Sequence, residues 1–136
     1  MNKKEIFYTL ISPMYFHLQL SGFAYRKYLQ NKIYLHAEAL RSSNKRIARL
    51  LLKHAALIPG ELQEDTLALL SHYDSWFAQF RIHKKKVKPE ADDDFIFNPV
   101  DEQTAFPKSA EENIIHYYEN LKQELEKARL VEHKAN

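Results

Sequence analysis

The sequence lacks cysteine altogether and contains only two glycines, Gly22 and Gly60, in 136 residues. The absence of cysteine excludes disulfides, thiolate metal sites, iron–sulfur clusters and cysteine nucleophiles, and it fits a reducing compartment such as the cytoplasm. The scarcity of glycine leaves little material for tight β-hairpins or glycine-rich phosphate loops. We therefore expect a helical, cytoplasmic protein without the common nucleotide-binding loops.

Recognisable metal and nucleophile motifs are also missing. None of the seven histidines lies three or four residues from another, and neither HExxH nor ExxH occurs. Glu112 and His116 are four residues apart, a spacing more typical of an ordinary surface pair than of two metal ligands. We expect no metal ion, no cofactor and no catalytic group from a standard motif.

The run from Ile6 to Tyr25 has no formally charged residue and lies between two basic pairs, as a membrane span does. Pro13, Gly22 and several hydroxyl and amide side chains make it too polar for such a span. No small-residue cleavage site follows its short apolar beginning, which argues against a signal peptide. We expect a buried or interface helix here and no membrane association.

Apolar residues recur at spacings of three and four, the period of an amphipathic helix, in four segments. We predict a single domain over 1–136, an all-α, antiparallel, four-helix bundle-like fold with helices at about 3–30, 32–57, 61–82 and 109–132. Pro13 is either a kink or a first-turn residue of the first helix. Ser109 and Glu112 have the spacing of a capping box at the start of the last helix.

The segment 87–108 loses the helical period and contains three prolines and an acidic cluster, Glu90, Asp92, Asp93 and Asp94. We predict an irregular loop in which 95–97 and 105–106 form either a short two-stranded β-clip or an apolar anchor packed on the helices. Asn44 falls within the apolar stripe of the second helix. We expect its side chain to fix register or to bond to a neighbouring helix.

The charge divides at Pro89: fifteen Lys and Arg against six Asp and Glu precede it, and five against twelve follow from it onward. A segment of about +9 is thus joined to one of about −7, which suggests charged partners or internal pairing. A second basic cluster, from Arg81 to Lys88, directly precedes the acidic cluster, so local neutralisation is its simplest explanation. The candidate polyanion- or partner-binding residues are Arg41, Lys45, Arg46, Arg49, Lys53, Lys84, Lys85 and Lys86.

On the second helix, four of these cations follow one another at four-residue steps, which places them in one row on the helix surface. Like charges at this spacing repel by a few tenths of a kcal/mol per pair, roughly. The row is therefore a solvated face, is paired with acids of the same chain, or serves an acidic protein or a nucleic acid.

The residues Arg49-Leu50-Leu51-Leu52-Lys53-His54 have an Arg-x4-His spacing. In this the segment resembles the HEPN superfamily of helical ribonucleases, which cleave RNA without metal. The resemblance covers six residues and implies an all-α fold, with Arg49 stabilising phosphate charge and His54 positioning or transferring the proton of the ribose 2′-hydroxyl. His54 also completes the apolar stripe, so a core or helix-terminal histidine is the alternative.

The first helix is apolar nearly all round, which indicates contacts on several sides. We expect its aromatic side chains to form an apolar interface with a protein partner or a second copy, through Phe7, Tyr8, Tyr15, Phe16, Phe23 and Tyr28. The preferred function is a non-enzymatic helical interaction module, a small subunit or adaptor of a protein complex. The alternative is an RNA-binding protein or a metal-independent ribonuclease that uses Arg49 and His54.

Overall fold

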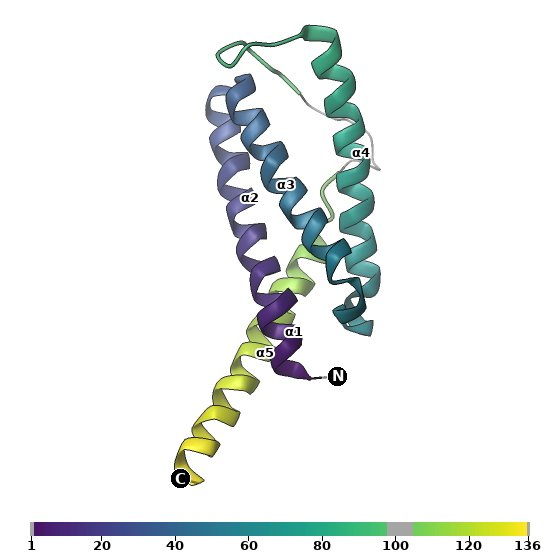
Figure 1. The fold of residues 1–136 in the computed structure, drawn as a ribbon. Coiled ribbons are helices and arrows are strands. Elements are labelled where there is room, and N and C mark those ends of the chain that lie inside the picture. Colours follow the sequence, from purple (N-terminus) through teal and green to yellow (C-terminus); the bar gives the residue numbers. More distant parts are fainter. Residues whose placement is uncertain (1, 98–104, 136) are drawn as a thin grey trace.

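The computed structural model describes residues 2–97 and 105–135, and Figure 1 shows how they are arranged. The α-helices are α1 (Lys3–Ile6), α2 (Ser12–Asn31), α3 (Tyr34–Lys53), α4 (Gln63–Val87) and α5 (Lys108–Ala135). A π-helical turn, η1 (Phe7–Ile11), joins α1 to α2, and two 3₁₀ turns, η2 (Ala55–Leu57) and η3 (Gly60–Leu62), join α3 to α4. The predicted all-α, antiparallel, four-helix bundle-like fold is confirmed.

The first predicted helix is one rod made of α1, η1 and α2. Pro13 lies in the first turn of α2, directly after the π turn. Proline has no N–H and its ring crowds the preceding turn, so a wider turn before it lets the helix continue. This rod contains the uncharged run, and none of the described helices is long and apolar enough to cross a membrane.

The loop after α4 is fastened to the connection between α2 and α3. The first amides of α3, from Tyr34 and Leu35, each donate to loop carbonyl oxygens at 2.9 Å, those of Asp93 and Ala91. In return, the Phe95 amide donates to the carbonyl oxygen of Lys32 at 2.8 Å. The first amides of a helix lack partners within the helix, so the loop supplies the cap for α3.

Within the described part of this loop, the apolar residues form an anchor on the helices. Phe95 is completely buried, and the Tyr28 hydroxyl donates to its carbonyl oxygen at 2.6 Å. The same hydroxyl accepts a hydrogen bond from the Phe97 amide at 2.9 Å. A single antiparallel bridge joins Ile33 to Asp94, and the turn of the proposed β-clip, 98–104, lies outside the described residues.

The core consists of two clusters along the length of the bundle. The larger cluster joins the N-terminal rod to α5 and to the facing ends of α3 and α4 through side chains such as Leu10, Ile47 and Ile114. The smaller one is aromatic and lies where the loop covers α2, α3 and α4, with Tyr28, Ala37, Leu40, Trp76, Phe80 and Phe95. The predicted apolar stripes therefore face the core as expected.

The last helix differs from its prediction at both ends. It begins at Lys108, one residue early, so Ser109 lies inside the first turn and the predicted capping box is wrong. It also continues past the other helices, as Figure 1 shows, with the Lys3 ammonium 2.8 Å from the Glu124 carboxylate near the point where it leaves them. Ala128, expected in the buried stripe, is exposed for this reason.

Because the Tyr28 hydroxyl of α2 makes hydrogen bonds to the loop backbone at Phe95 and Phe97, we predict that Tyr28→Phe destabilises the fold. The substitution leaves a buried carbonyl and an amide without their partner, which costs about 1 to 3 kcal/mol. Urea unfolding should show this loss, whereas the matched change Tyr8→Phe, on an exposed ring, should leave the free energy of unfolding unchanged. Equal stability of both variants would contradict the anchoring role of Tyr28.

Candidate functional site

The cations of α3 lie on its solvent-facing side. Arg46, Arg49 and Lys53 are exposed and Lys45 is half-buried. The recorded ion pairs of the described residues are Lys3 with Glu124 and Arg41 with Glu38, so none of these four cations has an acidic partner there. The row predicted from four-residue spacing is thus a bare basic surface as far as the structure describes the chain.

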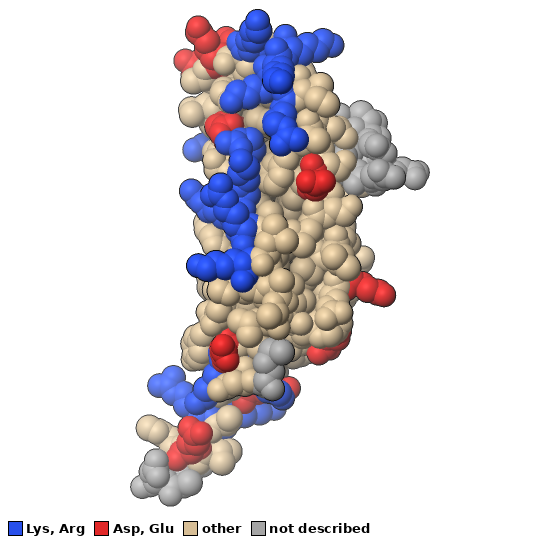
Figure 2. All heavy atoms as spheres, turned by 45° about the vertical axis from the view of Figure 1, so that its right-hand side comes forward, with Lys and Arg blue, Asp and Glu red and all other residues tan. Residues whose placement is uncertain are grey.

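The row continues onto the C-terminal end of α4. The Lys84 ammonium lies 5.5 Å from the centre of the Tyr34 ring, at the start of α3, which places the two helix ends side by side. A hydrogen bond that its ammonium donates to the Tyr34 hydroxyl raises the pKa of Lys84, so this side chain stays charged. Figure 2 shows the Lys and Arg side chains as one column along the molecule. We call this column the basic stripe: Arg41, Lys45, Arg46, Arg49, Lys53, Lys84, Lys85 and Lys86.

Among the described residues, acidic side chains leave most of the basic stripe without a partner. The acidic cluster after α4 turns over the N-terminus of α3, where its carbonyl oxygens accept the first helical amides and its negative charge suits the helix dipole. Its Asp93 carboxylate accepts from the Glu90 amide at 2.7 Å, and no ion pair joins it to Arg81 or to the lysines of α4 among the described residues. Helix α5 carries six Glu and five Lys and Arg, so it is close to neutral, and it packs on α2, α4 and η1.

One cation of the stripe does have a partner. The Arg41 guanidinium donates to the Glu38 carboxylate, with its Nε 3.0 Å from both carboxylate oxygens. These bonds lower the pKa of Glu38, with a smaller contribution from the Tyr34 hydroxyl. Because Glu38 is the one acid on the exposed side of α3, the positive charge is least compensated from Lys45 to Lys53.

The two residues of the Arg-x4-His pattern lie in different surroundings. Arg49 is exposed on the basic stripe, whereas His54 is half-buried and ends α3 as its C-terminal cap residue. Neither residue lines the cavity described below. Across the described residues, no three His, Asp or Glu side chains gather in a way that could hold a metal ion.

The six aromatic residues predicted as an apolar interface separate into two groups. Phe7 and Tyr28 are buried in the core, and Tyr15 is half-buried with its ring stacked 4.0 Å from that of Tyr118. Tyr8, Phe16 and Phe23 are exposed. Leu20 lies between the last two on the same side of α2 and is exposed as well, so an outer stripe of α2 consists of Phe16, Leu20 and Phe23.

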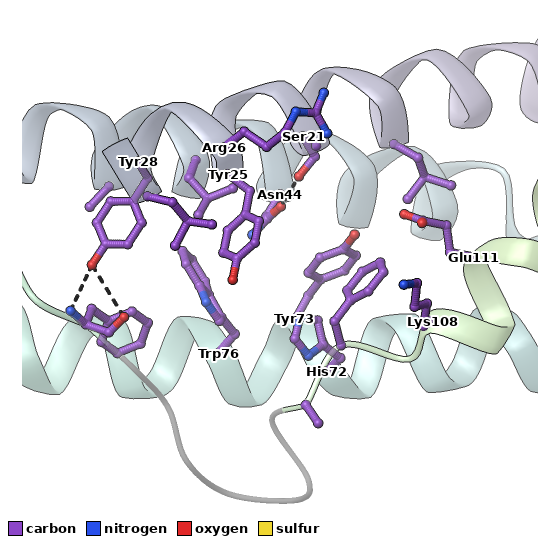
Figure 3. Close-up of a pocket in the computed structure, with 18 of the residues that line it drawn as sticks. Ser21, Tyr25, Arg26, Tyr28, Asn44, His72, Tyr73, Trp76, Lys108 and Glu111 are labelled. Carbon is purple, nitrogen blue, oxygen red and sulfur yellow. Dashed lines mark hydrogen bonds between the residues drawn. The ribbon is translucent and has the colours of Figure 1, made fainter. Parts of the chain in front are cut away.

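A cavity of about 840 Å³ lies between the two core clusters, as Figure 3 shows. Its walls come from α2, α3, α4, the start of α5 and both described ends of the loop. Aromatic rings dominate them, including Tyr25, Tyr73, Trp76, Phe97 and Phe106. Sequence reasoning missed this cavity because its lining residues follow no common spacing and belong to five separate segments.

Polar groups are placed at defined points in the wall. The Ser21 hydroxyl of α2 donates to the Asn44 side-chain oxygen of α3 at 2.5 Å, which confirms that Asn44 bonds to a neighbouring helix. At the other end lie Lys108 and Glu111, from the first turn of α5. Burial raises the pKa of Glu111, and Lys108 offsets only part of this effect.

Comparison with known proteins found no matching family model, no matching curated protein and no matching solved structure.

The two perturbed carboxyl groups predict opposite pH effects. Glu38 has a lowered pKa, so its ion pair stabilises the fold above the ordinary value of 4.5 and is lost as the pH falls through the folded value. Glu111 has a raised pKa, so the wild type loses stability as the pH rises through its folded value.

We therefore expect Glu38→Gln to destabilise the protein at neutral pH by less than about 1 kcal/mol, as partly exposed ion pairs do. Glu111→Gln should instead stabilise it at neutral pH. Both differences from wild type should vanish in acid, where the two carboxyl groups are protonated. Urea unfolding at several pH values measures this, and shifts of the same sign for both variants would refute the assignment.

Proposed function

We propose that the protein is a non-enzymatic interaction module that binds the phosphate backbone of a nucleic acid along the basic stripe. The observation that carries this proposal is the row from Lys45 to Lys53, which has no acidic partner among the described residues. Charges of one sign on one helix face repel one another, and a bound polyanion relieves that repulsion. A location in the cytoplasm remains a prediction from the composition.

The composition of the stripe favours phosphate over an acidic protein. Protein interfaces have an apolar or aromatic centre, with charges mainly at the rim. Along α3 the exposed side carries cations, with Leu35 and Leu52 as its two large exposed apolar residues. Interfaces with nucleic acid are more polar and much more positively charged, as this surface is.

The geometry also suits an extended polymer. Four helical residues rise about 6 Å, so the row from Arg41 to Lys53 is about 18 Å long. Lys84 of α4 lies beside Tyr34 at the start of α3, so the lysines at the end of α4 extend the cations beyond Arg41. A straight line of cations on a convex helix contacts successive phosphates without reading bases, so we expect little sequence preference.

We predict that the protein binds unstructured RNA with a strong dependence on salt. Four phosphate contacts, from Lys45, Arg46, Arg49 and Lys53, give a slope of log affinity against log salt of about −3. The triple variant Lys45→Gln, Arg49→Gln, Lys53→Gln should reduce the slope by about two units and weaken binding at low salt. Fluorescence anisotropy with labelled poly(U) measures both quantities.

The matched control removes the same charge from α5, with Lys122→Gln, Lys127→Gln and Arg129→Gln, three exposed residues outside the stripe. This control should bind RNA nearly as wild type. Equal losses in both triple variants would show nonspecific attraction and overturn the proposal, and tighter binding to poly-glutamate than to RNA would point to an acidic protein instead. The RNA should remain intact; cleavage without metal that His54→Ala abolishes would make the protein a ribonuclease.

A second contact, with another protein chain, is favoured by the outer stripe of α2. Phe16, Leu20 and Phe23 are 56%, 53% and 61% exposed, and they lie within two helical turns. No acidic residue occurs in α2, so only Arg26 and Lys27 limit close approach of a second copy at this face. We propose self-association through this stripe, which would present two basic stripes in one particle.

This second proposal predicts that Leu20→Glu weakens self-association by about tenfold or more, because a charge would be buried at the centre of the contact. The matched control is Leu67→Glu, at another exposed leucine, on α4 away from the stripe. Sedimentation equilibrium compares the three proteins. A wild type that remains monomeric throughout the concentration range would refute self-association.

A further inference from the structure

The cavity between the two core clusters has the dimensions of a small-molecule site. Its volume of about 840 Å³ falls within the usual range of roughly 300 to 1,000 Å³ for ligand pockets. It shares no lining residue with the basic stripe. An inference about this cavity is therefore independent of nucleic-acid binding.

Three nearly buried side chains offer hydrogen bonds that the described residues do not use. Asn44, Tyr73 and Trp76 are 6%, 2% and 7% exposed, and all three line the cavity. No hydrogen bond to a described residue is made by the Asn44 amide nitrogen, the Tyr73 hydroxyl or the Trp76 indole nitrogen. None of the three atoms is among the enclosed polar atoms that lack a partner.

These three groups come from two facing helices and converge. Asn44 lies on α3, where Ser21 of α2 already holds its side-chain oxygen, so the amide nitrogen is the donor that remains. Tyr73 and Trp76 lie on the opposite wall, and in Figure 3 the Tyr73 hydroxyl points across the cavity toward α2 and α3. Burial raises the pKa of Tyr73, so its hydroxyl remains protonated and able to donate.

The charges at the edge of the cavity are mainly positive. Among the described residues, Arg26, Lys32 and Lys108 line it, against one carboxyl group, that of Glu111. The Arg26 guanidinium folds back beside Gly22, where a Cβ would be only 3.3 Å from its nitrogen, so the glycine makes room for this position. It lies 4.8 Å from the centre of the Phe23 ring, which supports it from the outer side.

From this arrangement we infer that the cavity binds a flat, aromatic organic anion of low molecular weight. The rings of Tyr25, Trp76 and Phe106 would pack against its planar body. Its oxygen acceptors would receive hydrogen bonds from Asn44, Tyr73 and the Trp76 indole. Its anionic group would lie at the edge, beside Arg26.

The probe for this site is 8-anilinonaphthalene-1-sulfonate, a fluorescent aromatic sulfonate. Trp76 is the only tryptophan of the chain, so energy transfer from tryptophan to the bound probe reports occupancy of this cavity. We expect one probe molecule per chain. The uncharged analogue N-phenyl-1-naphthylamine should bind about tenfold more weakly, because it lacks the charge-assisted contact with Arg26.

Paired variants separate the cavity from other apolar surfaces. Arg26→Gln should weaken binding of the probe by about tenfold, the usual effect of losing a charge-assisted hydrogen bond. The neighbouring change Lys27→Gln, outside the cavity, and Phe16→Ser, on the outer stripe of α2, should leave its affinity unchanged. Circular dichroism establishes that each variant remains helical.

Two results would overturn the inference. One is equal affinity of the wild type and the Arg26 variant for the probe. The other is loss of the signal in Phe16→Ser, which would place the probe on the outer stripe of α2. RNA binding should be unaffected by Tyr73→Phe, so failure of this site and failure of the basic stripe are distinguishable.

Discussion

The attachment of the loop to the open end of the α2–α3 pair is the interaction on which the other features of the molecule depend. Phe95 enters the core between the helices, while the backbone on either side of it caps α3 and bonds to Tyr28. Burial of one aromatic ring stabilises by roughly 1.5 to 3 kcal/mol, and the satisfied backbone groups avoid a comparable penalty. Helix α5 starts only at Lys108, so this loop must close the part of the bundle that a fourth helix would otherwise cover.

Both candidate sites follow from that arrangement. A loop fills the space beside α2, α3 and α4 less completely than a helix would, and the cavity lies where the loop replaces the helix. The same attachment holds the acidic cluster at the N-terminus of α3, where it suits the helix dipole, and so keeps it off the basic stripe. Helix α5, which is close to neutral, lies against α2 and α4. The charge asymmetry of the chain thus becomes a spatial separation.

The helices could be predicted from periodicity because burial of one face every 3.6 residues is a local property of the sequence. Ala37, Leu40, Ile47 and Leu51 were expected in the core and are buried. Predictions from nearby residues failed at the two ends of α5. Ser109 has the spacing of a cap, yet α5 begins one residue earlier, and Ala128 follows the apolar stripe of α5 into a part of the helix that has no neighbour. Spacing shows which residues share a face, but not whether anything packs against it.

The sequence by itself determined the helical class, the antiparallel order and the row of cations on α3, because each depends on residues close together along the chain. Tertiary structure alone decided that the described acidic residues leave the row from Lys45 to Lys53 without a partner, that half of the predicted apolar interface is internal, and that Asn44, Tyr73 and Trp76 line one cavity. These outcomes depend on contacts between residues far apart in sequence, such as the hydrogen bond between Tyr28 and Phe95. The spacing of neighbouring residues does not reveal such contacts.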